Sequence, residues 1–148
     1  MSTYTQILYQ IVFSTKHRGR TLKKEHRPAL FKFIWGVLNN KKCHLYRING
    51  VEDHLHIVLH LHPSVSLAGL VKDIKLASSI FIKNSGLFPM FDGWQDGYGA
   101  FSYHYSGKDH LIEYVKNQET HHQKLSFREE LMALLLEHGV EFDERYLE

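Results

Sequence analysis

The chain has 148 residues, which suits one domain with its own hydrophobic core and is too short for two domains of ordinary size. With 43% hydrophobic and 23% charged residues, its composition is typical of a globular protein. No stretch approaches the roughly 20 apolar residues of a membrane span, and the alternating N-terminus is not typical of a signal peptide. The single cysteine, Cys43, excludes an internal disulfide framework and favours a cytoplasmic location.

The charge is distributed unevenly along the chain. Residues 1–50 contain ten Lys/Arg and one acidic residue, for +9, whereas residues 51–148 contain eight Lys/Arg and fifteen Asp/Glu, for −7, which together give +2. A basic half on a nearly neutral protein is typical of a surface that binds a polyanion such as nucleic acid. The alternative is a solvated helix surface, which is what most charge runs are.

The elements of the first half follow from periodicity. Residues 4–13 alternate between polar and apolar side chains, which predicts a strand with one buried face. After a basic loop, apolar residues recur at helical spacing from Leu30 to Leu38, with Pro28 in the first turn. Residues 43–48 and 54–62 are predicted to be two strands joined at Asn49-Gly50, a common hairpin turn.

The second half is predicted to be mostly helical. The expected elements are a helix from about residue 67 to Gly86, a loop over 87–99, a strand over 100–105, and two helices over about 108–122 and 126–139. Ser126 to Glu129 fits a capping box at the start of the last helix.

This order, β-α-β-β-α-β followed by two helices, predicts an α+β fold of the ferredoxin-like (split βαβ) type. It has an antiparallel sheet with two helices on one face, which leaves the other face free for a ligand. We expect a single domain over 1–148, with a ferredoxin-like core at 1–105 and the two C-terminal helices within 106–148. Many unrelated activities share this fold, so it does not decide the function.

The strand over 54–62 carries four histidines on one face. Because side chains alternate across a strand, its leucines and Ile57 face the helices and its histidines face the other way. Two histidines at i and i+2 lie close enough to ligate one ion. They also suit the polar face of a half-buried strand. Periodicity does not choose between the pairs His54/His56 and His60/His62.

The first C-terminal helix places Tyr114 and Gln118 on one face, four residues apart. By pattern alone, Tyr114 is an ordinary packing residue with a solvated hydroxyl and Gln118 a good surface helix former.

The two motifs together resemble the single-tyrosine HUH transposases of the insertion sequence 200/605 group. The matching pieces are His54-Leu55-His56 and Tyr114-Val115-Lys116-Asn117-Gln118, with further similarity over residues 9–20 and 97–102. The resemblance covers about residues 4–122, and it selects His54/His56 over the second pair. Residues 123–148 carry no recognised motif.

The resemblance implies a metal-dependent reaction on single-stranded DNA. His54, His56 and Gln118 would bind a divalent ion, Mg²⁺ or Mn²⁺, that coordinates the scissile phosphate at hairpin-containing element ends. Tyr114 would attack phosphorus and form a 5′-phosphotyrosine, which a 3′-hydroxyl later resolves without a nucleotide cofactor. The family also implies a homodimer in which the tyrosine helix completes the partner's site by pivoting at Ser106-Gly107.

The ligand set has chemical consequences. Because all three ligands are neutral, the ion keeps its full charge for the substrate. Magnesium prefers oxygen ligands and imidazole suits later metals, so we expect weak, exchangeable binding. The further candidate ligands for adventitious metal are His60, His62, His121 and His122.

The basic N-terminal residues are expected to contact phosphates in a salt-dependent manner. They are Lys16, Arg18, Arg20, Lys23, Lys24 and Arg27.

Three alternatives stay open. A domesticated relative that nicks DNA at repeat hairpins would use the same chemistry. A non-catalytic single-stranded nucleic-acid-binding domain would bind without metal and form no covalent adduct. A metal hydrolase acting through bound water would give Tyr114 and Gln118 no role.

Overall fold

A computed structural model describes residues 1–147 of the chain; Glu148, the last residue of the predicted domain, lies outside the described residues. The strands and α-helices are, in chain order, β1 (Leu8–Ser14), α1 (Arg27–Asn40), β2 (His44–Gly50), β3 (His54–His60), α2 (Leu67–Ser85), β4 (Gly99–Tyr103), α3 (Lys108–Lys116), α4 (Gln118–His121) and α5 (Phe127–Glu137). None of the helices in this part of the chain is long and apolar enough to cross a membrane.

The four strands form one antiparallel sheet in the order β2-β3-β1-β4. This is the split βαβ arrangement, so the predicted ferredoxin-like fold is confirmed. Strand β3 lies between β1 and β2, and His56 is opposite Val12 on one side and Asn49 on the other. A residue near the middle of β3 therefore has paired backbone on both sides.

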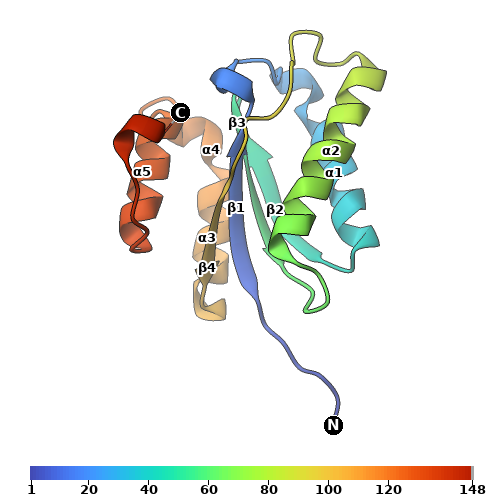
Figure 1. Cartoon of the computed structure of the whole chain (residues 1–148), viewed down its shortest axis with the longest axis vertical. Coiled ribbons are helices and arrows are strands. Elements are labelled where there is room, and N and C mark those ends of the chain that lie inside the picture. The colour runs from blue at the N-terminus through green and yellow to red at the C-terminus, as the bar shows by residue number, and fades with distance from the viewer. Residues whose placement is uncertain (148) are drawn as a thin grey trace.

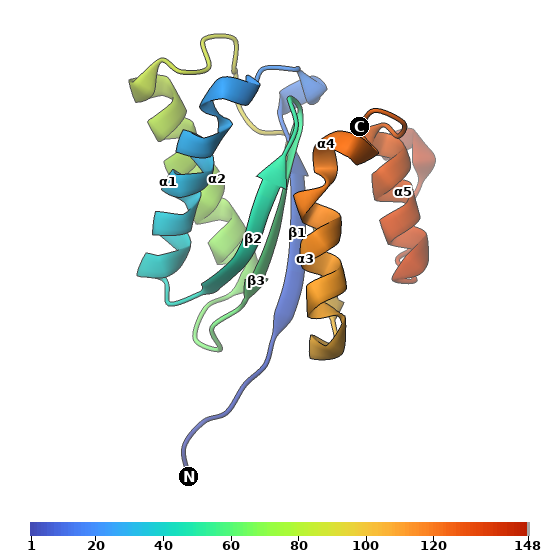
Figure 2. The same ribbon diagram turned by 180° about the vertical axis from the view of Figure 1, so that it is seen from behind.

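The two faces of the sheet are covered by different helices (Figures 1 and 2). On one face, Leu55, Ile57 and Leu59 of β3 join a core cluster with the buried residues of α1 and α2. On the other face, Val58 packs against Leu111 and Val115 of α3. The predicted alternation of β3 is correct. The second face is not open as predicted, because α3, α4 and α5 cover it, so a ligand on this face would lie between these helices and the sheet.

The predicted end signals of α2 and α5 are confirmed. The Ser66 hydroxyl accepts the Gly69 N–H at 3.1 Å at the start of α2, and Gly86 ends that helix with a φ of 68°. At the start of α5, the Ser126 hydroxyl accepts the Glu129 N–H at 3.2 Å and donates to the Glu129 carboxylate at 3.0 Å.

The hairpin turn begins two residues later than predicted. Asn49 and Gly50 belong to β2, and residues 51–53 form the connection to β3. A Cβ on Gly50 would lie 2.4 Å from the His54 carbonyl oxygen, so glycine is needed there for close packing of the strands.

The helix predicted over 108–122 is interrupted at Asn117, which separates α3 from α4. The Asn49 side chain donates to the Lys116 carbonyl oxygen at 2.9 Å, which satisfies one of the carbonyl groups left open where α3 ends. The interruption changes the direction of the chain between Tyr114 and Gln118.

Candidate active site

The site begins with two fully buried histidines on the second face of β3. Each imidazole uses its Nδ1 atom for a neighbour: His54 Nδ1 lies 2.7 Å from the Asp53 carboxylate, and His56 Nδ1 lies 2.6 Å from the Gln10 amide oxygen. A metal-binding histidine commonly donates its second nitrogen in this way, which fixes the ring and its tautomer. Both Nε2 atoms then remain for a ligand between the sheet and α5.

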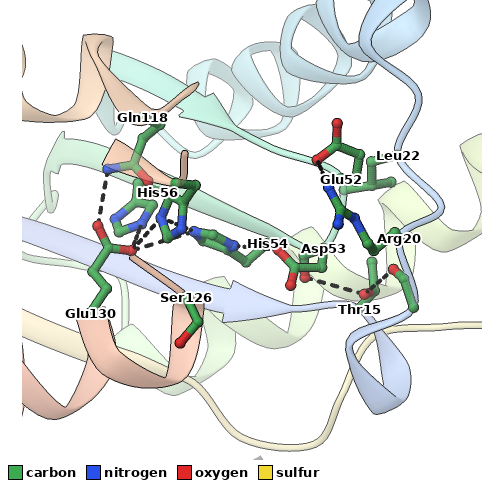
Figure 3. A network of polar contacts seen from close by, with 12 residues as sticks. Thr15, Arg20, Leu22, Glu52, Asp53, His54, His56, Gln118, Ser126 and Glu130 are labelled. Carbon is green, nitrogen blue, oxygen red and sulfur yellow. Dashed lines mark hydrogen bonds and ion pairs between the residues drawn. The ribbon is translucent and has the colours of Figure 1, made fainter. Parts of the chain in front are cut away.

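A carboxylate from α5 lies at the centre of this space. Glu130 is only 1% exposed, and its Oε1 atom is 2.8 Å from His56 Nε2 and 3.4 Å from His54 Nε2. Figure 3 shows His56 and His54 extending from β3 toward Glu130, with the Gln118 amide beside His56 and next to the same carboxylate. A buried carboxylate is costly unless it is paired, and here it contacts several donors.

The short helix α4 and the residue after it supply two further polar side chains. The Gln118 amide nitrogen donates to Glu130 Oε2 at 3.2 Å, while its Oε1 atom is buried without a hydrogen-bond partner. His122 Nε2 lies 2.9 Å from Glu130 Oε1 and 3.0 Å from His54 Nε2. Gln118 and His122 thus both contact the Glu130 carboxylate.

Tyr114 reaches the same carboxylate from α3. Its half-buried hydroxyl donates to Glu130 Oε2, and its ring lies 6.2 Å from the His56 ring, measured between centroids. Burial and the neighbouring Glu130 carboxylate hold the pKa of the Tyr114 hydroxyl well above its ordinary value. The structure therefore brings Tyr114, Gln118, His54 and His56 together around Glu130 within one subunit.

The electrostatics of the site separate the two histidines. Burial lowers the pKa of His56 to about 4, which favours the neutral imidazole that a metal needs. Burial also disfavours the charged form of His54, but its hydrogen bonds with Asp53 and Glu130 outweigh this and raise its pKa. Burial of Glu130 is likewise outweighed by the surrounding imidazoles, so its pKa is lowered and the carboxylate stays ionised.

These side chains fit a divalent ion. The Gln118 Oε1 atom is a buried acceptor with no donor among the described residues, and a cation would satisfy it. Two imidazole Nε2 atoms point into the same space. Among residues 1–147, one group of ligand-type side chains offers donor atoms that all lie within 4.8 Å of one another, namely His54, His56, His122 and Glu130.

Of the four other candidate histidines, three lie outside the cluster. His60 Nδ1 accepts the Ile7 backbone N–H at 3.1 Å, and His62 Nδ1 lies 2.7 Å from the Ser64 hydroxyl. The His121 ring packs on Tyr114, with the centroids 4.6 Å apart. Only His122 of these histidines enters the cluster.

Five of the six basic residues expected to contact DNA lie at least partly on the surface, but Arg27 does not. Its guanidinium donates to the Leu22 carbonyl oxygen at 2.9 Å and pairs with Glu52 at 3.8 Å and Glu119 at 3.4 Å. With an exposed side-chain fraction of 4%, Arg27 joins the start of α1 to α4 and has no free face for a phosphate.

The basic loop that follows β1 lies next to the site. The Arg18 guanidinium stands 5.9 Å from the centroid of Phe127, whose ring stacks on His54 at 4.3 Å. His17 and Arg18 both have positive φ angles, 54° and 53°, which non-glycine residues seldom adopt. Arg20 and His122 also line one groove of about 360 Å³ beside the histidine cluster.

Sequence reasoning missed Glu130 as a member of the site. In α5 the buried residues are Phe127, Glu130 and Leu134, so an acidic side chain lies on the apolar stripe at helical spacing. That position was the available signal, because carboxylates are rarely buried without a partner.

A strand histidine pair that faces a tyrosine-bearing helix, on a ferredoxin-like sheet, defines an HUH-type transposase class. The model of the family described as "Transposase IS200 like" matches residues 3–118. The chain therefore belongs to the IS200-like transposase family, as its motifs predict.

Two solved structures share the fold. One, described as a transposase of Deinococcus radiodurans R1, has a TM-score of 0.64 at 20% identity, over 80% of this chain and 95% of that one. The other is a REP-associated tyrosine transposase bound to a REP hairpin, with a TM-score of 0.61 at 16% identity, over 82% of this chain and 74% of that one. A comparison with curated proteins gives no match.

Proposed function

We propose that this protein cleaves and rejoins single-stranded DNA at insertion-sequence ends through a 5′-phosphotyrosine on Tyr114. The observation that carries the proposal is the convergence of Tyr114, His56 and Gln118 on one buried carboxylate, that of Glu130. A tyrosine that only packs against a helix would not need a hydroxyl partner shared with a strand histidine. A non-catalytic nucleic-acid-binding domain would have no use for this buried group of side chains.

The metal would be held by His54, His56 and the free Oε1 atom of Gln118. When bound, a divalent ion neutralises the scissile phosphate and polarises its P–O bonds, which lowers the barrier to attack by an oxygen nucleophile. Asp53 and Gln10 would assist metal binding, because their contacts with the Nδ1 atoms orient the imidazoles of His54 and His56.

Tyr114 supplies the nucleophile. Its ordinary pKa is near 10, and the pKa is raised further in this site, so the phenol must lose its proton as it attacks. Glu130 Oε2 already accepts the hydrogen bond from that hydroxyl and is the base within reach. The new Tyr114 O–P bond forms as Glu130 accepts the phenol's proton, and the P–O3′ bond breaks. The leaving O3′ takes up a proton from solvent to become a 3′-hydroxyl, and Glu130 returns its proton to solvent. Attack by a 3′-hydroxyl on the phosphotyrosine reverses these steps and reseals the strand.

DNA is proposed to approach over the basic loop. The residues proposed to contact phosphates are Lys16, Arg18, Arg20, Lys23 and Lys24, which all lie at least partly on the surface. The groove lined by Arg20, Lys124 and His122 leads from this loop to the histidine cluster. Binding through such contacts weakens steeply with added salt. The REP-associated relative is bound to a hairpin, so a hairpin with a single-stranded flank is the appropriate first substrate.

The active site is proposed to work within one subunit of a homodimer. Tyr114 contacts the Glu130 carboxylate that its own subunit's His56 also contacts, and residues 105–107 form a 3-10 turn that continues directly into α3. A mixture of Tyr114→Phe and His56→Ala subunits should therefore regain no cleavage. Regained cleavage would instead mean that the tyrosine helix exchanges between subunits.

The test is formation of a covalent adduct with labelled single-stranded hairpin DNA in Mn²⁺ or Mg²⁺, followed on a denaturing gel. Wild type should give an adduct that chelation abolishes, and Tyr114→Phe should give none. Tyr98→Phe is the matched control, because Tyr98 is an exposed tyrosine outside the site and should keep the adduct. An adduct that survives in Tyr114→Phe, or cleavage without any adduct, would overturn the proposed function.

A further inference from the structure

Two ligand-type side chains of the site lie beyond the family's matched region. The family model ends at residue 118, whereas His122 and Glu130 follow it on the C-terminal segment. Both side chains are turned inward toward the histidine pair, and Glu130 is almost completely buried. Burying an ionised carboxylate between helices is expensive unless a compensating charge lies beside it.

The spacing of the donor atoms is that of ligands around one ion. Two ligand atoms about 2.1 Å from a metal and about 90–110° apart are separated by about 3.0–3.4 Å. Here Glu130 Oε1 lies 2.8 Å from His56 Nε2 and 2.9 Å from His122 Nε2. His54 Nε2 lies 3.0 Å from His122 Nε2 and 3.4 Å from Glu130 Oε1. These four separations lie within or just below that range, and the other pairs of donor atoms lie within 4.8 Å of one another.

The orientation of the imidazoles gives a second argument. The Asp53 carboxylate accepts from His54 Nδ1, so the Nε2 atom of a neutral His54 carries a lone pair. That lone pair faces His122 Nε2 and the Glu130 carboxylate oxygen. Electron pairs that point at one another repel unless a cation lies between them, either a proton on one of the imidazoles or a metal ion. A divalent ion in this space would be shared by all four side chains.

We propose that His122 and Glu130 are protein ligands of the same divalent ion, in addition to the ligands named above. The inference rests on the proposed function, since it adds two ligands to that metal site. The centre would then contain three imidazoles, one carboxylate and the Gln118 carboxamide. An imidazole-rich set of this kind favours Mn²⁺, Co²⁺ or Zn²⁺ over Mg²⁺. Binding would also be tighter than the weak, exchangeable binding expected from two histidines and a glutamine.

The added ligands would couple the metal to the C-terminal helix and to the nucleophile. Glu130 comes from α5, so the ion would hold α5 against the sheet. The two oxygens of its carboxylate have different neighbours: Oε1 faces the imidazoles, and Oε2 accepts from Tyr114. Binding of the ion would therefore fix the position of the carboxylate that positions the Tyr114 hydroxyl.

The test measures metal binding without DNA. Purified full-length protein is titrated with Mn²⁺, followed by electron paramagnetic resonance, and with Co²⁺, followed by its visible absorption. Glu130→Gln and His122→Asn should each weaken the Kd about 10-fold or more and change the Co²⁺ spectrum. Glu129→Gln and His110→Asn replace exposed residues of the same types, on α5 and α3, and should match wild type.

Thermal unfolding with and without Mn²⁺ provides the folding check. Each variant should unfold cooperatively in chelator, and Mn²⁺ should raise its Tm less than that of wild type. The two variants change different side chains, so a folding defect in one leaves the other to decide.

The outcomes separate the two proposals. If wild type binds the ion, His54→Ala abolishes binding, and both test variants keep the wild-type Kd and Co²⁺ spectrum, then His122 and Glu130 are not ligands. If wild type itself binds neither Mn²⁺ nor Co²⁺, the proposed metal-dependent function fails as well.

Discussion

The two faces of strand β3 carry side chains of opposite character, apolar on one face and mostly polar on the other. The face toward α1 and α2 presents Leu55, Ile57 and Leu59 to a continuous apolar core. The face toward α3, α4 and α5 presents His54 and His56 to a buried group of polar side chains. Because successive residues alternate across a strand, neighbouring positions of β3 belong alternately to the apolar core and to the candidate active site.

The two faces stabilise this small domain in different ways. Apolar burial on the first face contributes free energy with no need for partners. On the second face, each buried polar group needs a partner, and the contacts of His56 with Gln10 and Glu130 supply two. The second face is therefore the one where an added ion should change the stability.

The largest loss of stability is expected on the first face. Ile57→Ala removes a fully buried side chain from the core and should lower the free energy of unfolding by about 2–5 kcal/mol, measured by urea denaturation. His56→Ala, one position away, should cost less and should abolish the DNA adduct. Equal losses of stability at the two positions would contradict the division between the faces.

Metal addition should act through the second face. A ligand that binds only the folded state at about 100 times its Kd raises the free energy of unfolding by about 2.7 kcal/mol. We expect a gain of this size for wild type in Mn²⁺ and none for His54→Ala, measured by urea denaturation. A gain that persists in His54→Ala would place the ion elsewhere.

Arg27 is a basic residue expected to contribute to stability and not to DNA binding. Arg27→Met removes the bond to the Leu22 carbonyl and the pairs with Glu52 and Glu119, and should cost about 1.5–3 kcal/mol. The salt dependence of DNA binding, measured by fluorescence anisotropy at several ionic strengths, should not change. A clear loss of salt dependence would mean that Arg27 contacts phosphate after all.

Arg20 should show the opposite behaviour, with the smallest effect on stability. Its ion pair with Glu52 is exposed and is worth less than about 1 kcal/mol. Arg20→Ala should reduce the slope of log affinity against log salt by about one phosphate contact. Unchanged DNA binding would remove Arg20 from the proposed interface.

The sequence predicted the fold well because its signals are local. The alternation in β3 and the capping residues Ser66 and Ser126 each act within a few residues. The prediction of a turn at Asn49-Gly50 is wrong because Gly50 packs closely against the next strand. This long-range contact outweighs the local preference of Asn-Gly for a turn. The interruption at Asn117 likewise involves a side chain 68 residues away, that of Asn49.

The site was predictable only where the family's motif reaches. His54, His56, Tyr114 and Gln118 come from that motif, and the structure brings them together. Glu130 joins them through the packing of α5, which no local pattern specifies. The same limit applies to Arg27, since only the fold reveals that its charge is buried.

The most direct measurement is peptide mapping of the covalent adduct by mass spectrometry. Wild-type protein is incubated with single-stranded hairpin DNA and Mn²⁺, the DNA is trimmed with nuclease, and the protein is digested. We expect a nucleotide joined through its 5′-phosphate to Tyr114. A nucleotide on any other residue, or cleaved DNA with Tyr114 unmodified, would contradict the account.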